Sequence, residues 1–555
     1  MAHTKSSIDS NTLALLGKKE VLKRRFGFWS LFGFAICELV TWETVLAIFN
    51  VGFDNGGPAG LVYGFIIAWS SSLSVYTVIS ELASMAPIAA GQYYWVHMLA
   101  PERYKVFCSY IIGWLTMLAW IATVATQSIF AGTICQGLIV LSHEDEYEPE
   151  LWQGTLFAWL VIVVAILINV LTPGALPKFE IFIIVFHIAG FITIMSILWM
   201  YSPHRSAQFV FTTSLNEGGW PTQGLSYCVG FMGNVATFVG ADASVHLAEE
   251  VINASWNIPR AIIGAMFING AVGFSMMLTL LFCIGDVSNV LDTATGYPFI
   301  QIFYDCVKSI PGAVMMGVIV LVLTWACAIG ICTTASRMTW SFARDNGTPF
   351  SKTIGYVSKS RRIPTMAILV VTGISALLVM IYIGSSTAFN DVISLTITGF
   401  YGSYFLPAAF LLYHRVKGHI RLHKQGILGL PIALDGHDAT KVNDRSEDRQ
   451  CAFGQNDCRV SAAEATLIWG PFHLPGWLGI INNAYACVYM LFVIFWSCWP
   501  SEIPINYNRM NYSVVVTGGV IIFSIIWYYI QAHKEYKGPT VDGEIGALMV
   551  NRESV

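Results

Sequence analysis

Long apolar runs recur along the whole chain and constrain its fold more than any other feature. A helix needs about 20 mostly apolar residues to cross a bilayer, and the sequence contains twelve candidate runs. They are 28–50, 58–80, 104–138, 151–171, 179–201, 221–245, 258–285, 311–343, 365–384, 390–413, 475–499 and 512–531. Only 12% of the 555 residues are charged, against about 25% in soluble domains. The sequence therefore predicts an all-α polytopic membrane protein with twelve transmembrane helices.

The distribution of basic residues indicates the orientation of these helices. With the N-terminus placed inside, only Arg205, Lys308 and Arg509 of the 30 Lys and Arg residues fall outside. Loops rich in Lys and Arg stay in the cytosol, so both termini are predicted to be cytosolic. The first 27 residues are polar, with no apolar region ahead of their basic cluster, so no cleavable signal peptide is expected.

The spacing of the spans predicts how the chain is organised. The expected segments are a cytosolic tail 1–27, a ten-helix core 28–414, a cytosolic loop 415–474, two further helices 475–531 and a cytosolic tail 532–555. Within the loop, residues 425–465 mix charges without periodicity, which is typical of a flexible insert or of a translated intron. The net charge of −4 gives no reason to expect a nucleic-acid partner.

The stretch 227–260 joins a spanning helix to ionisable residues. It contains Asp242 partway along an apolar run that also holds Gly230, Gly233 and Gly240. A carboxylate at membrane depth must face protein or water, and glycines weaken the helix around it. Such a helix can unwind so that its backbone coordinates a small solute. A glycine-rich packing face with a buried, paired aspartate is the alternative.

The first span, 28–50, carries two carboxylates that a lipid-facing helix surface would not tolerate. Glu38 and Glu43 should both face the bundle interior. We assign Glu43, beside Trp42, to substrate or proton contact, and Glu38 to hydrogen bonding between helices. In the fifth span, His187 is either a proton carrier, because histidine titrates near neutral pH, or a hydrogen-bonded core residue.

The remaining polar residues favour no enzyme. No nucleophile–base set and no phosphate-binding loop lies where water would reach it. Most of the twelve cysteines lie inside predicted spans without metal-ligand spacing, so no metal and no cofactor is expected.

Four separated motifs carry a resemblance to a known family. The stretch FVGADASVHLAEEVINASWNIPRA resembles the sixth-helix signature of the amino acid–polyamine–organocation permease superfamily. The pieces TWE…NGGP, ELASMAPIAAGQYYW and ASRMTWSFARDNGTPF are similar to its fungal branch of amino acid, GABA and choline permeases. The motifs occur in the right order, and the similarity runs from about Leu13 through the last span, except for 425–465.

The resemblance implies a leucine-transporter-like fold. Its two inverted repeats would be 28–201 and 221–414, with the first and sixth helices broken at the centre. Here the breaks should fall at about Thr41–Thr44 and Phe238–Asp242, with the substrate between them. Alternating access would then come from rocking of one helix group against the other.

The resemblance also implies the site residues. The expected substrate contacts are Thr41, Trp42, Glu43, Thr44, Phe238, Val239, Gly240 and Ala241, and the proton-coupling candidates are His187 and Asp242. Many amino acid permeases have small residues at the first break, whereas this chain has an acid that would attract an ammonium group. Trp42 would add a cation–π contact.

The function implied is that of a secondary active permease in the lipid bilayer of the plasma membrane. It would import a small amine, amino acid, GABA, choline or polyamine together with protons. A non-transporting nutrient sensor on the same fold is the alternative, and the long cytosolic loop is the feature that points to it.

Overall fold

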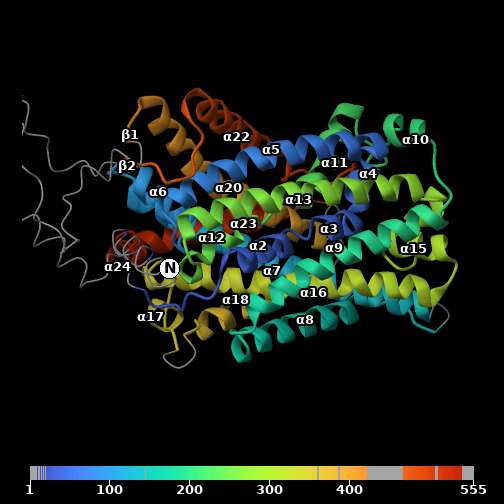
Figure 1. Cartoon of the computed structure of the whole chain (residues 1–555), viewed down its shortest axis with the longest axis horizontal. Helices are drawn as coiled ribbons and strands as arrows, with labels where there is room; N and C mark the ends of the chain where they lie inside the picture. The colour runs from blue at the N-terminus through green and yellow to red at the C-terminus, as the bar shows by residue number, and fades with distance from the viewer. Residues whose placement is uncertain are drawn as a thin grey trace, which may run out of the picture.

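The chain forms a bundle of long helices. The computed structural model describes residues 9, 13, 16, 18, 20–143, 146–358, 362–384, 388–421, 467–506 and 510–539. The long helices lie side by side, with most short elements at the two ends (Figure 1). The predicted insert 425–465 lies outside the described residues.

The helices that cross the bundle without interruption begin and end as follows. They are α5 (Gly57–Met85), α7 (Lys105–Ser142), α8 (Leu151–Leu171), α9 (Leu176–Tyr201), α13 (Ala254–Cys283), α16 (Ile310–Arg344), α18 (Thr365–Val379), α20 (Ala388–Lys417), α22 (Gly476–Trp496) and α23 (Ser513–Trp527). Two further crossings are built from shorter helices: α2 (Phe28–Leu39), α3 (Thr41–Ala47) and α4 (Phe49–Asp54), then α11 (Gln223–Ala236) and α12 (Ala243–His246).

Short elements cover the ends of the bundle. They are α6 (Gln92–Leu99), α10 (Ala207–Thr212), η1 (Ala248–Glu250), α14 (Val287–Leu291), α15 (Pro298–Val307), α17 (Ser351–Ile354), α19 (Ile381–Gly384), β1 (Ile420–Arg421), β2 (Leu467–Ile468), η2 (Tyr528–Ala532) and α24 (His533–Glu535). The strands β1 and β2 pair in parallel.

The spanning helices agree with the sequence prediction. Eleven segments of the described chain are long and apolar enough to cross a membrane. Large apolar side chains such as Phe182, Val185 and Ile192 of α9 point out of the bundle, as lipid-facing positions require. The all-α polytopic class is therefore confirmed. The predicted span 221–245 contains no continuous helix of that length, because it is interrupted between α11 and α12.

The first crossing is interrupted at Val40. This residue has φ 40° and ψ 41°, in the left-handed region, where it ends α2 and precedes α3. A β-branched residue rarely adopts this conformation, so the surrounding structure must impose it, as is common at functional sites. The break lies one residue before the predicted Thr41–Thr44, whose residues are helical in α3.

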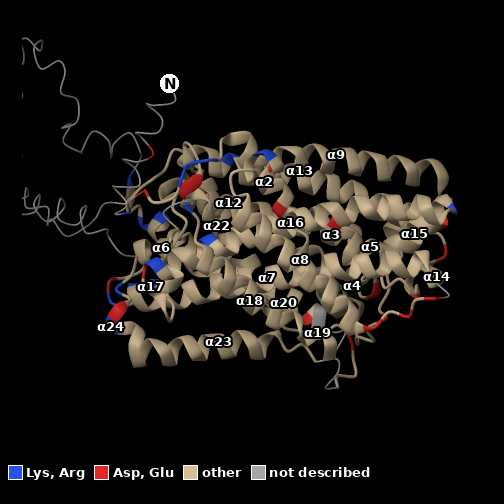
Figure 2. Ribbon diagram, turned by 90° about the horizontal axis from the view of Figure 1, so that it is seen from below, with Lys and Arg blue, Asp and Glu red and all other residues tan. Residues whose placement is uncertain are grey.

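The two ends of the bundle differ. The closed end is the end at which residues 20–26, α6, α17 and α24 lie. The open end is the opposite one, with α4, α10 and α15 (Figure 1) and α14 (Figure 2). Figure 2 shows Lys and Arg gathered at the closed end and mainly Asp and Glu at the open end. The gathering of Lys and Arg at one end agrees with the asymmetry of basic residues in the sequence.

Candidate substrate site

The two helix breaks lie against each other in the middle of the bundle. The Thr41 hydroxyl, just after the first break, donates to the Thr237 carbonyl oxygen at 3.2 Å, just after α11 ends. Residues 237–242 are not helical. Gly240 has φ 95°, a conformation that glycine adopts without strain. The second break therefore agrees with the predicted range Phe238–Asp242.

Tyr76 of α5 holds the unwound segment in place. Its hydroxyl donates to the Phe238 carbonyl oxygen at 2.9 Å and accepts from the Ala241 N–H at 3.4 Å. Tyr76 is buried, and an unwound backbone inside a membrane protein needs such partners. Sequence reasoning missed this residue because a tyrosine in an apolar helix has many structural roles.

A cavity of about 70 Å³ lies at the two breaks. Its described lining comes from both broken crossings and from α7, α16 and α20: Glu38, Leu39, Val40, Thr44, Ala47, Ile48, Thr123, Thr126, Gln127, Phe130, Ala236, Val239, Ile331, Ile393, Thr396 and Ile397. Of the predicted substrate contacts, Thr44 and Val239 line this cavity. The structure places Thr41, Trp42, Glu43, Phe238, Gly240 and Ala241 next to it, outside its lining.

Glu38, and not Glu43, is among the residues that line this cavity, but its carboxylate oxygens are buried. Only 4% of Glu38 is exposed, and neither carboxylate oxygen has a hydrogen-bond partner among the described residues. The helix-to-helix hydrogen bonds predicted for Glu38 are therefore not formed by its carboxylate. The residue packs against Gly330 of α16, where an added Cβ would overlap its Oε1.

Glu43 and Trp42 face the fifth crossing, α9, instead. The Glu43 Oε1 lies 2.8 Å from the His187 Nδ1, and the Trp42 Nε1 lies 3.2 Å from the same nitrogen. All three side chains are buried. The structure thus brings the predicted proton carrier His187 together with two of the predicted substrate contacts.

Asp242 sits at the centre of a second polar cluster. Gln92 of α6 donates to its Oδ2 at 2.6 Å, and the Tyr404 hydroxyl of α20 donates to its Oδ1. The His246 Nε2 lies 3.5 Å from Oδ2. All four side chains are buried. His246 was missed by sequence reasoning, although its position four residues after Asp242 is the spacing of side-chain neighbours on one helix face.

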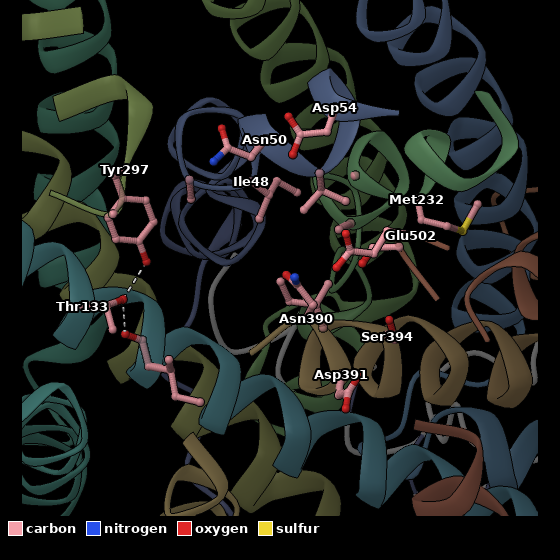
Figure 3. Close-up of a pocket in the computed structure, with 18 of the residues that line it drawn as sticks. Ile48, Asn50, Asp54, Thr133, Met232, Tyr297, Asn390, Asp391, Ser394 and Glu502 are labelled. Carbon is pink, nitrogen blue, oxygen red and sulfur yellow. Dashed lines mark hydrogen bonds between the residues drawn. The ribbon is translucent and has the colours of Figure 1, made fainter. Parts of the chain in front are cut away.

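A vestibule of about 620 Å³ leads from the open end to the central cavity. The two share lining residues, namely Ala47, Ile48, Ala236, Ile393 and Ile397. Five acids line the vestibule: Asp54, Glu150, Glu217, Asp391 and Glu502. None of its described lining residues is Lys, Arg or His. Figure 3 shows Asp54, Asp391 and Glu502 around this space.

The acids of the vestibule affect one another. Asp54 lies in α4, beyond the first crossing's apolar segment. Burial, together with the neighbouring Glu217 and Glu502, raises the pKa of Asp54 to about 6. Asp54 therefore changes charge around pH 6.

Ion pairs seal the closed end. Arg344 at the end of α16 makes a two-bond pair with Glu249 of η1, at 2.8 and 2.9 Å. The neighbouring Arg337 donates from Nε to Glu250 at 2.9 Å. Lys18 of the N-terminal segment pairs with Asp345. These pairs join the sixth crossing and the N-terminal segment to α16 at this end.

Comparison with known proteins identifies the family of this chain. A family model described as amino acid permease matches residues 26–521, which is most of the chain. The chain belongs to the amino acid permease family. Among the described residues of this permease, no group of three or more His, Cys, Asp or Glu is arranged to hold a metal ion.

Curated relatives extend over nearly the whole permease. It is 27% identical over 517 residues to a choline transporter of Saccharomyces cerevisiae, covering 93% of this chain and 83% of that one. It is 28% identical over 549 residues to a GABA-specific permease of the same yeast, covering 97% and 87%. The resemblance to the fungal amino acid, GABA and choline permeases is therefore confirmed, and this permease is a membrane transporter.

Solved structures support the fold. A manganese transporter mutant of Eremococcus coleocola superimposes with a TM-score of 0.52 at 13% identity, covering 92% of this permease and 95% of that chain. A complex of the same transporter gives a TM-score of 0.50, also at 13% identity. At this identity the similarity is one of fold, and it carries nothing about the solute.

Proposed function

We propose that this permease imports a small nitrogenous solute by alternating access, together with protons. One observation carries the proposal: a vestibule open at one end reaches a cavity between two broken helices, while ion pairs seal the other end. A fixed central site with one closed side is the arrangement that alternating access requires. With a wide vestibule at one end and ion pairs at the other, the permease is in a conformation that a solute would enter from the open end.

The distribution of charge supports the direction of import. Lys and Arg gather at the closed end (Figure 2), and positively charged ends remain in the cytosol. The N-terminal segment and α24 lie at this end (Figure 1). Both termini are therefore proposed to be cytosolic, with the vestibule facing the outside of the plasma membrane.

The names of the relatives support the class of solute. Choline and GABA, named for the two yeast relatives, are both small and carry an amine or quaternary ammonium group. Amino acids and polyamines belong to the same broad class. The backbone at Phe238, Gly240 and Ala241, with Thr41, remains proposed as the wall that closes on the solute when the vestibule shuts.

The geometry around His187 supports proton coupling. The Trp42 Nε1–H can only donate, and an ionised Glu43 can only accept, yet both face the His187 Nδ1. If Glu43 is ionised, Nδ1 must carry a hydrogen to donate to it. That hydrogen and the Trp42 N–H hydrogen then face each other and repel. A proton on Glu43 leaves Nδ1 free to accept. The protonation state of this cluster is thus linked to Trp42, two residues after the first break.

Asp242 and His246 form a second site suited to one proton. The His246 Nδ1 lies 2.8 Å from the Ala89 carbonyl oxygen, which only accepts, so Nδ1 carries the hydrogen. The Nε2 atom of a neutral ring then turns a lone pair toward the Asp242 Oδ2. The lone pair on Nε2 and the ionised Oδ2 repel each other. One proton added to Nε2 or to Oδ2 would replace this repulsion with a hydrogen bond at the second break.

Uptake measurements test the proposal. A permease-deficient yeast strain expressing the full chain is given labelled choline, GABA, arginine and leucine at about pH 5 and about pH 7.5, a range that spans the titration of histidine. We expect saturable, acid-stimulated uptake of at least one solute. If the permease is well expressed at the cell surface but no solute is taken up, transport is contradicted and the nutrient sensor is favoured.

The vestibule predicts a separate effect of pH on KM. Asp54 is ionised above its pKa of about 6 and neutral below it. Acidification therefore removes negative charge from the vestibule and weakens its attraction for a cation. We expect KM for choline to rise about two- to fivefold between about pH 7.5 and about pH 5, even where the maximal rate increases.

An Asp54→Asn variant isolates this effect. Its KM should be higher than that of the parent at about pH 7.5 and should change less with pH, because position 54 no longer titrates. Glu146→Gln, at an acid of the same end outside the vestibule lining, is the matched control. A KM whose pH dependence is the same in both variants would remove Asp54 from the path of the solute.

A further inference from the structure

A short segment that precedes α22 lies across the closed-end termini of α5 and α20. This segment, the strap, comprises residues 469–475 and connects β2 to α22 at the closed end (Figure 1). The Phe472 N–H donates to the Ser84 Oγ at 2.9 Å, and the Leu474 N–H donates to the Glu81 Oε1 at 2.6 Å. Two side chains from the last turns of α5 therefore hold the main chain of the strap.

The strap lies directly against the backbone of α5. A Cβ added at Gly470 would lie 2.3 Å from the Ser84 carbonyl group, so glycine is the residue that fits there while the strap is in place. The Ser84 hydroxyl also donates to the Ser255 carbonyl oxygen at 3.0 Å, in the first turn of α13. The strap is thus joined to α5 directly and to α13 through one side chain.

Arg415 joins the strap and α5 to α20. Its side chain is only 5% exposed, and its Nη2 donates to the Glu81 Oε1 at 2.6 Å. The Arg415 Cζ lies 4.6 Å from the centre of the Trp469 ring in the strap, within the range of a cation–π contact. The Arg415 Nη1 donates to the Gly479 carbonyl oxygen of α22. One buried cation therefore connects α5, α20, α22 and the strap.

The helix that the strap holds also supports the second break. Tyr76 lies five residues before Glu81 in α5, which is about 7.5 Å along a helix axis. The Tyr76 hydroxyl bonds to the backbone of the unwound segment at Phe238 and Ala241. Because a helix is stiff over this distance, a movement of the end of α5 also moves the support of the second break.

Opening of the closed end would move the partners of the strap. The start of α13 follows shortly after Glu249 and Glu250, whose ion pairs with α16 lie at this end. Separation of these pairs would displace the start of α13, and with it the Ser255 carbonyl oxygen that accepts from Ser84. Arg415 fastens the same end of α5 to α20 and α22. The strap and Arg415 therefore resist this motion.

We propose that the strap is a latch, which holds α5 and α13 against α20 while the vestibule is open and must leave α5 before solute is released at the closed end. Arg415 and Glu81 are then positioning residues, which act through α5 and Tyr76 without touching the solute. This inference rests on the proposed function, because a latch has a role only where the closed end opens.

A reversible cross-link tests whether the strap must leave α5. The double variant Ser84→Cys/Phe472→Cys places a thiol on each side of the 2.9 Å contact between strap and helix, within reach of a disulfide after mild oxidation. The purified full-length chain is placed in liposomes and given labelled choline, GABA, arginine and leucine. We expect uptake to fall at least about tenfold on oxidation and to recover when dithiothreitol reduces the disulfide.

The parent and the two single variants, treated in the same way, control for the twelve native cysteines. Their uptake should be unchanged by oxidation. Peptide mapping shows whether the disulfide has formed. A cross-linked protein that takes up solute at the rate of the reduced protein would overturn the proposal, because the strap would then travel with α5. Failure of the disulfide to form would overturn it as well, because the strap would not lie on α5.

Loosening the strap should have the opposite effect on the closed end. Gly470→Ala places a methyl group against the Ser84 carbonyl, and Arg415→Met removes the cation that faces Glu81. A weaker latch leaves a smaller fraction of the permease open to the vestibule, and the apparent KM rises as this fraction falls. We expect KM to rise about three- to tenfold while Vmax changes by less than about twofold. Arg415→Lys keeps the charge and should restore part of the loss.

Two matched variants separate this effect from a general loss of stability. Gly174→Ala adds a methyl group at a glycine whose added Cβ meets nothing within 4 Å. Lys417→Met removes an exposed cation from the last turn of α20. Both should keep the KM of the parent. If Gly470→Ala and Arg415→Met also keep it, the strap is a packing element and the proposal is overturned.

The same liposomes separate failure of the latch from failure of the proposed function. A parent protein that transports none of the four solutes would reject the proposed function, and the latch with it. A parent that transports, together with a cross-linked variant that transports equally well, would reject the latch alone.

Discussion

An Arg344→Met variant is expected to lose about 3–5 kcal/mol of stability at the closed end, the usual cost of removing one partner of a buried ion pair. Arg344 is 12% exposed and Glu249 only 1%, and the guanidinium satisfies both carboxylate oxygens of Glu249. Methionine preserves the apolar stem but leaves that carboxylate buried without its two donors. We expect a large fall in thermal stability in detergent and loss of uptake.

Two further variants show whether the effect belongs to the pair. The double variant Arg344→Met/Glu249→Gln removes both charges and should recover most of the lost stability, because no buried charge is left unpaired. The Arg344 Cζ lies 4.4 Å from the centre of the Trp340 ring. Arg260 stacks in the same way, with its Cζ 4.7 Å from the centre of the Trp256 ring, but is exposed. Arg260→Met should change stability by at most about 0.5 kcal/mol. Equal melting shifts for Arg344→Met and Arg260→Met would mean that the pair does not hold the closed end.

An Asp242→Asn variant is expected to lower Vmax/KM at least about 100-fold and to abolish acid stimulation. Asp242 accepts from Gln92 and Tyr404, and a hydrogen bond to a buried charged group contributes about 1.5–3 kcal/mol. The asparagine amide keeps one oxygen that can accept from Gln92 or Tyr404, but its N–H₂ group then faces the other of these two donors. It also removes the acid that we propose to share a proton with His246. Initial uptake rates across the acidic range measure both effects.

The variant His246→Gln removes the titratable ring but keeps a side chain that can form hydrogen bonds at this position. Glutamine can donate to Asp242 but does not titrate in this range, so uptake should persist with a flat pH profile. Tyr404→Phe removes one donor and leaves both titratable groups, so it should lower uptake while acid stimulation remains. Full acid stimulation in Asp242→Asn would exclude the Asp242–His246 pair as the proton site.

The spanning helices were predictable because their signal is long and repeated. A run of about 20 apolar residues has few alternatives in a chain with so few charges, and eleven described segments meet that criterion. The break in the sixth crossing was predictable too, because Gly240 marks it directly. The inverted repeats 28–201 and 221–414 remain predictions.

The break in the first crossing was harder to place. Neither Val40 nor its two neighbours in the chain is a glycine or a proline. The left-handed conformation of Val40 is imposed by tertiary contacts, which a local sequence pattern does not reveal. A shift of a few residues along a helix changes which face a side chain occupies. For this reason Glu38, which was assigned to hydrogen bonding between helices, lines the cavity, while Glu43 faces His187.

The polar partners of the site were the least predictable. Tyr76, Gln92 and Tyr404 lie on three different helices and meet the unwound segment only in the folded bundle. A single sequence contains no record of which helix faces meet. His246 alone had a local signal, its spacing from Asp242.

The start of the first crossing and the end of the sixth are fastened together at the closed end. The backbone of Phe26 pairs with Val251, the N–H groups of Arg25 and Phe26 donate to the Glu250 carbonyl oxygen, and Ile252 donates back to Phe26. Main-chain bonds do not depend on side-chain charge, so neither salt nor pH loosens this clasp. In the proposed transport cycle, this backbone pairing would make the inner ends of the two broken helices move together.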